Sequence, residues 1–81
     1  MILPAKHLRT ERSLIGIGGE VLLLLDEAKT VSRLWEDFCQ RREQSMRQTV
    51  GFDRFVLALD MLFSIDAIYL ERERILRRGS R

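Results

Sequence analysis

Apolar residues recur every three or four positions along three stretches of the chain, which is the spacing of one helix face. The first stretch starts at Thr10–Ser13 and reaches Asp26, with Leu14, Ile17, Val21, Leu24 and Leu25 on its apolar face. The second runs from Thr30, whose hydroxyl can cap the first turn, to about Gln44. The third runs from about Phe52 to Asp66. The pattern predicts three helices, with a polar connection between the second and the third.

The period of the pattern changes after the third helix. Ile68 and Leu70 alternate with Tyr69 and Glu71, and a second apolar segment around Ile75 follows Arg72-Glu73 and could run back along the first. This alternation is typical of a two-stranded hairpin. Since two-residue turns prefer glycine or asparagine to an Arg-Glu pair, a continued helix is the alternative.

These elements predict a mainly α fold with a small C-terminal β-hairpin, arranged as a winged-helix-like three-helix domain. We expect one domain over residues 1–81. Because proline disfavours helix at the residue before it, Pro4 suggests an extended lead over residues 1–9. Residues 79–81 are expected to form a disordered tail.

The third helix is apolar on two faces. At about 100° per residue, one side collects Phe55, Val56, Leu59, Leu62 and Phe63, and this side should face the core. The opposite side collects Leu57, Met61 and Ile65, with Arg54 beside them. A helix with two apolar faces is normally covered on both. Either the hairpin or the lead covers the second face, or a partner protein or a second copy of the chain does.

Composition narrows the function. The chain has 81 residues, of which 46% are apolar, and a formal net charge of +2. A domain of this size buries too little surface to spare a large pocket, which argues against a self-sufficient enzyme with its own cofactor fold. No apolar run approaches the roughly 20 residues of a membrane span. A single cysteine excludes a disulfide scaffold, so we expect a reduced, cytoplasmic domain.

Positive charge gathers at the C-terminal end, where four arginines lie in or beside the predicted hairpin: Arg72, Arg74, Arg77 and Arg78. They could contact nucleic-acid phosphates without sequence preference, or an acidic patch on a protein partner. A solvated, partly disordered C-terminus is the favoured explanation for them. Sequence-specific reading of DNA is not expected, because the third helix offers only Arg54 to base edges.

Reactive side chains are scarce. His7 is the only histidine and Cys39 the only cysteine, whereas a zinc site needs about four ligands and a nucleophile needs a base. We therefore expect no catalytic, cofactor-binding or metal-binding residues, and we place Cys39 at the edge of the core. Gly16, Gly18 and Gly19 each cost about 1 kcal/mol in a helix. They indicate an irregular first turn or a neighbouring backbone that comes close enough to exclude side chains.

Four segments carry a family resemblance, in this order: residues 3–8 (LPAKHL), 25–35 (LDEAKTVSRLW), 52–62 (FDRFVLALDML) and 67–70 (AIYL). Together they resemble the small middle component, type six, of prokaryotic ABC-three-component systems. The resemblance implies a non-enzymatic subunit encoded between an ABC-type ATPase of the SMC/Rad50/RecF sort and an effector. It also implies a role in defence against phages or plasmids. The family's hairpins commonly carry glycine at the turn, where this chain has Arg72-Glu73.

Two hypotheses of different classes follow. The first is an adaptor that binds the ATPase and the effector through Leu57, Met61, Ile65 and Arg54. The second is a winged-helix nucleic-acid binder or transcriptional regulator that uses the basic hairpin. The first requires an exposed apolar face on the third helix, and the second requires a free basic surface.

Overall fold

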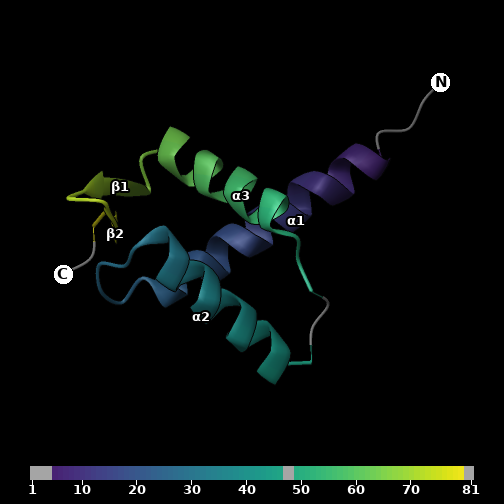
Figure 1. Cartoon of the computed structure of the whole chain (residues 1–81). Helices are drawn as coiled ribbons and strands as arrows, with labels where there is room; N and C mark the ends of the chain where they lie inside the picture. The colour runs from purple at the N-terminus through teal and green to yellow at the C-terminus, as the bar shows by residue number, and fades with distance from the viewer. Residues whose placement is uncertain (1–4, 47–48, 80–81) are drawn as a thin grey trace.

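The computed structural model describes residues 5–46 and 49–79, with side chains from Ser13 onward. The elements are α1 (Ala5–Leu24), α2 (Val31–Gln44), α3 (Phe52–Ser64), β1 (Ile68–Glu71) and β2 (Arg74–Arg77). Helix α1 passes through the middle of the fold and contacts both α2 and α3, and the hairpin lies at the end opposite the N-terminus (Figure 1). The mainly helical fold with a C-terminal hairpin is confirmed, and it is compatible with a winged-helix-like arrangement.

Helix α1 begins earlier than the sequence predicts. It starts at Ala5, so the residues from Ala5 to Arg9 are helical and not the extended lead that we expected. Proline restricts the residue before it and fits the first turn of a helix, so Pro4 does not prevent a helix from starting at Ala5. The remainder of the predicted lead, residues 1–4, and residues 80–81 of the predicted tail lie outside the described residues.

Helix α2 begins where the sequence predicts. The Thr30 hydroxyl accepts a hydrogen bond from the Arg33 amide at 3.2 Å, which satisfies one of the free amides of the first turn. Helix α3 ends at Ser64, two residues before the predicted end. Asp66 then adopts a left-handed backbone (φ 62°) and directs the chain into β1.

The core lies where the three helices and the hairpin meet. Its buried apolar residues are Ile17, Val21, Leu25, Leu34, Phe38, Phe55, Ala58, Leu59, Leu62, Ile68 and Ile75. Trp35 packs against the core, with its ring centroid 5.0 Å from that of Phe55. Most of the apolar positions predicted on the first two helices therefore form the core or pack against it.

The buried face of α3 is rotated relative to the prediction. Ala58 is fully buried, whereas Val56 is half-buried and Phe63 is exposed over 38% of its surface. Helix α1 packs on the side of α3 that carries Met61 and Leu62. It therefore covers these residues and leaves Phe63 partly exposed. The prediction that Phe63 lies in the core is wrong.

The hairpin forms at the predicted residues, so the alternative of a continued helix is wrong. Strands β1 and β2 pair antiparallel with Ile68 opposite Arg77 and Glu71 opposite Arg74. Arg72 and Glu73 form the turn with φ of 54° and 65°, a left-handed backbone that normally selects glycine or asparagine. On its other edge, β2 exchanges two backbone hydrogen bonds with Lys29, of 3.2 and 2.7 Å, which adds a single bridge to the sheet.

Candidate interaction surfaces

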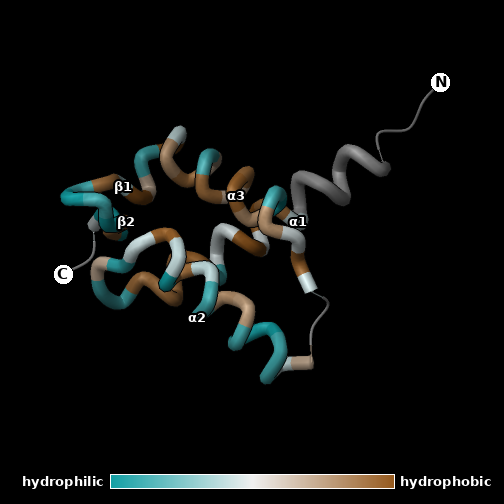
Figure 2. The backbone as a smooth tube through the Cα atoms, in the orientation of Figure 1, coloured by the Kyte–Doolittle hydropathy of each residue, from teal (hydrophilic) through white to brown (hydrophobic). Residues whose placement is uncertain are grey.

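Two of the three predicted partner-binding apolar residues on α3 are open to solvent. Leu57 is exposed over 51% of its surface and Ile65 over 65%. Met61, one turn from each, is partly buried, because it packs against α1 at Gly18. The second face of α3 is thus covered at its centre by α1, and its two ends remain exposed. Figure 2 shows the apolar character of α3 along its length.

Glycine explains how α1 reaches Met61. A Cβ atom built on Gly18 would lie 3.0 Å from Met61 Cε and 3.4 Å from Leu62 Cδ2, so the absence of a side chain lets the two helices approach. A close approach of α3 therefore explains Gly18, but the atoms that approach it belong to side chains and not to the backbone that the sequence suggested. Nothing lies within 4 Å of a Cβ built on Gly16 or Gly19, and packing within the described chain gives no reason for them.

Helix α1 carries a second exposed apolar stripe that the sequence analysis missed. Ile15 and Leu23 are exposed over 64% and 63% of their surfaces, and Gly19 lies between them at the same helical spacing. The missed signal is the lack of charge: Glu20 is the only charged residue from Ser13 to Leu25. The structure turns Glu20 inward, where its carboxylate accepts a 2.7 Å hydrogen bond from Arg42. The outward side of this stretch is therefore uncharged.

We define the α1–α3 surface as Ile15, Gly19 and Leu23 on α1 together with Leu57 and Ile65 on α3. Arg54, the remaining predicted partner-binding residue, is exposed at the N-terminal end of α3. Its Nη1 atom lies 3.5 Å from the Ser13 hydroxyl of α1, at the limit of a hydrogen bond. Arg54 therefore lies at the edge where the two helices begin to pack.

The four predicted basic residues fall into two pairs. Arg78 donates a 2.9 Å hydrogen bond to Asp66, and its guanidinium lies 4.3 Å from the centre of the Tyr69 ring. Arg77 donates to the Leu22 carbonyl near the end of α1 at 3.4 Å. Arg72 and Arg74 are exposed, and in the described part of the chain their side chains make no ion pair. Only Arg72 and Arg74 are thus available as a basic pair.

The other charged groups near the hairpin serve the fold. Lys29 is buried and its Nζ lies 2.7 Å from Asp37 Oδ2, while Arg33 Nε lies 3.3 Å from Asp37 Oδ1. The hydrogen bond from Lys29 lowers the pKa of Asp37, against the effect of burial, and Arg33 adds to the shift. These contacts fix the start of α2 relative to the segment that bridges to β2.

The structure offers no reactive centre among the residues that it describes. Cys39 is exposed, so the prediction that it packs at the core edge is wrong; the position points outward from α2. Partial burial of the thiol and the charge of Glu43 raise the pKa of Cys39, which opposes thiolate chemistry. No group of three metal-ligating side chains occurs within residues 13–46 and 49–79. The His7 side chain lies outside the described part.

Among the described helices, none is long and apolar enough to cross a membrane. Of the predicted candidate residues, Leu57 and Ile65 belong to the α1–α3 surface, and Arg72 and Arg74 lie at the tip of the hairpin. The two places share no residue, and each offers a different chemistry, one apolar and one basic.

The comparisons with known proteins agree with the resemblance seen in the sequence. The model of the family described as ABC-three component (ABC-3C) system Middle Component 6 matches residues 3–78. No curated protein and no solved structure matches the chain. Since the matched range includes all three helices and the hairpin, the chain belongs to the Middle Component 6 family of ABC-3C systems.

Proposed function

We propose that this domain is a non-enzymatic adaptor that couples the ABC-type ATPase of its system to an effector. The ATPase would be of the SMC/Rad50/RecF-like class, and the system would serve cytoplasmic defence against phages or plasmids. Membership of a middle-component family supports the presence of partner components of the same system. The α1–α3 surface is the observation that carries the proposal.

The apolar side chains of that surface are largely exposed to solvent. Four large apolar side chains on it, Ile15, Leu23, Leu57 and Ile65, are each exposed over half or more of their area. Single exposed apolar residues need no explanation, but four of them on two helices that pack against each other favour a protein interface. Burying such side chains on association supplies the hydrophobic free energy that holds partners together.

The experiment is co-purification of the tagged chain with the ATPase and the effector encoded beside it. Leu57→Asp with Ile65→Asp should abolish co-purification of at least one partner, because both changes place a charge in the interface. The doubly substituted chain should keep its helical circular dichroism spectrum, since both side chains are exposed. Met61 is a poor probe, because it packs on Gly18 and its loss would disturb the fold.

A matched control tests whether the effect is local. Val31→Asp makes the same kind of change at an apolar residue of α2 that is 37% exposed, away from the α1–α3 surface, and should leave co-purification intact. Retention of both partners by the Leu57/Ile65 variant would refute the assignment. Light scattering of the isolated chain tests whether a second copy of the chain covers the α1–α3 surface. A dimer that is lost in the Leu57/Ile65 variant would show that it does.

A further inference from the structure

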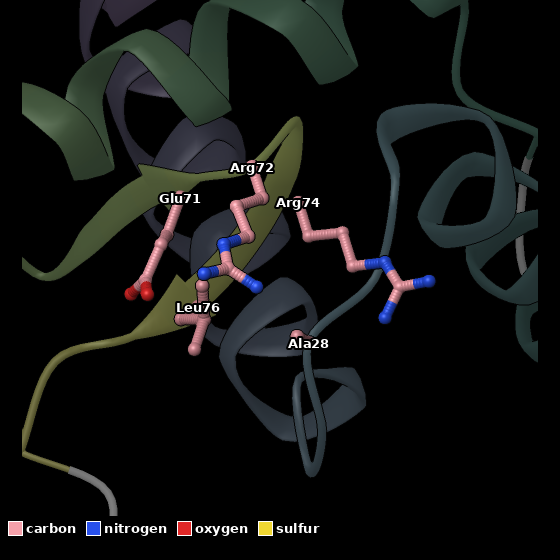
Figure 3. Close-up of a pocket in the computed structure, with 5 residues that line it drawn as sticks. All are labelled: Ala28, Glu71, Arg72, Arg74 and Leu76. Carbon is pink, nitrogen blue, oxygen red and sulfur yellow. The ribbon is translucent and has the colours of Figure 1, made fainter.

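A hollow in the surface lies at the tip of the hairpin, and none of its lining residues belongs to the α1–α3 surface. The hollow has a volume of about 400 Å³ and is lined by Ala28, Glu71, Arg72, Arg74 and Leu76. Figure 3 shows the side chains of Glu71 and Arg72 extending from the hairpin on the side of Leu76, and the side chain of Arg74 extending away from Leu76, past the segment with Ala28. A second hollow continues from it, shares Ala28 and Arg74, and adds Glu27 and Arg33 to the lining.

We infer that this hollow binds an acidic segment of a partner protein, with Arg72 and Arg74 receiving its carboxylates. This site goes beyond the proposed adaptor surface and shares no residue with it. Arg72 and Arg74 make no ion pair within the described chain, whereas Arg33, Arg41, Arg42 and Arg78 each have a carboxylate partner. A guanidinium pairs with a carboxylate through two parallel hydrogen bonds, so two adjacent arginines suit two acidic side chains.

The backbone of the turn sets where the Arg72 side chain begins. Arg72 and Glu73 both hold the left-handed backbone that a two-residue hairpin turn requires, and neither is glycine. The turn fixes the origin of the Arg72 side chain beside that of Arg74, two residues further along.

The lining favours a protein segment over nucleic acid. Leu76 is half-buried and Ala28 is small, so the hollow has an apolar part that can receive an aliphatic side chain. Glu71 lies in the hollow with the arginines, and Glu27 lines its continuation. These two carboxylates repel a phosphate backbone and an acidic segment alike, so the apolar part of the lining, which a phosphate backbone cannot use, is what favours a protein segment. An acidic segment with spaced aliphatic residues fits the mixed lining.

The test is titration of the ¹⁵N-labelled full chain with a 12-residue capped peptide of glutamates and leucines, followed by NMR. Shift changes are expected at Ala28, Arg72, Arg74 and Leu76. In fluorescence anisotropy, Arg72→Glu with Arg74→Glu should weaken binding at least about tenfold, because both charge-assisted contacts are lost. Replacement of both by lysine should weaken it less than charge reversal but measurably, since lysine keeps the charge and loses the paired geometry.

Two further variants separate this site from net charge and from the adaptor surface. Arg54→Glu reverses one charge on α3, half of the change in the double variant, and should leave peptide binding within about twofold, because its charge is remote and screened. Leu57→Asp with Ile65→Asp should also bind the peptide normally, even where it loses its partners. Lack of peptide binding, or shift changes confined to the α1–α3 surface, would refute the inference. So would tighter, Arg72/Arg74-dependent binding of a 20-base-pair DNA duplex, which would assign the hollow to phosphates.

Discussion

Glu20 Oε1 of α1 accepts a 2.7 Å hydrogen bond from Arg42 Nη2 of α2, and both side chains are largely buried. The pair connects two helices at the edge of the core, and Arg41 Nε lies 3.7 Å from the other carboxylate oxygen. Removing one member of such a pair leaves a charge with less solvent and fewer partners. The pair therefore makes the Glu20 carboxylate one of the contacts that hold α2 on α1.

The first prediction concerns this carboxylate. Glu20→Ala should lower the free energy of unfolding by about 3 kcal/mol, because the largely buried Arg42 guanidinium loses the Glu20 carboxylate as an acceptor. Urea denaturation followed by circular dichroism measures the change. Glu43→Ala, which removes an exposed acid from α2, is the control and should change stability by less than about 0.5 kcal/mol. Equal losses in the two variants would contradict the structural role of the Glu20–Arg42 pair.

The three glycines of α1 should respond differently to alanine. Gly16→Ala and Gly19→Ala should each stabilise the isolated chain by about 1 kcal/mol, since alanine favours helix and the added methyl meets nothing. Gly18→Ala should give no gain or a loss, because its methyl would meet Met61 and Leu62. Thermal denaturation of the three variants tests this order. A gain at Gly18 equal to the others would show that α1 and α3 are not closely packed there.

The Asp37 carboxylate should make stability depend on pH in acid. Its pKa is lowered in the folded chain, so its contribution is present at neutral pH and is lost as the pH falls below about 4, the ordinary range of aspartate. Asp37→Asn should therefore be less stable than the parent chain at pH 7, and the difference should shrink at pH 3. Urea midpoints at the two pH values measure it, and a difference independent of pH would contradict the ion pair.

Glycine at the second turn residue of the hairpin should stabilise the folded chain. Glu73→Gly should raise the free energy of unfolding by about 1 kcal/mol, because glycine adopts the left-handed backbone without a Cβ clash. Glu71→Gly, at a strand position without that backbone, should destabilise instead. Thermal melts of the two variants make the comparison. Destabilisation by Glu73→Gly would show that the Glu73 side chain contributes more than its backbone costs.

The order of elements could be predicted from the sequence because each has a local cause. Helical spacing of apolar residues marks α2 and α3, Thr30 marks the start of α2, and the change to alternation after Ala67 marks the hairpin. The hairpin forms in spite of its turn residues, because Ile68 and Ile75 are both buried in the core. Tertiary burial outweighs the unfavourable turn chemistry.

The faces of the helices could be predicted only in part. Which side of α3 is buried depends on where α1 crosses it, and that crossing is set by Gly18 and Met61, residues far apart in the sequence. The exposed stripe of α1 could not be predicted for the same reason. In the sequence Ile15 and Leu23 look like core residues, and only the positions of the neighbouring helices show that they are exposed. Local patterns identify an apolar position, but only the assembled fold decides whether it is covered.

The bridge between Lys29 and Ile75 joins the connection between α1 and α2 to strand β2. Lys29 belongs to the short segment between α1 and α2, and both its amide and its carbonyl are bonded to Ile75 of β2. The hairpin is therefore joined by two backbone hydrogen bonds to the junction of the first two helices. A partner bound to the arginines of the hairpin and another bound to α1 would contact two parts of the chain that these hydrogen bonds connect.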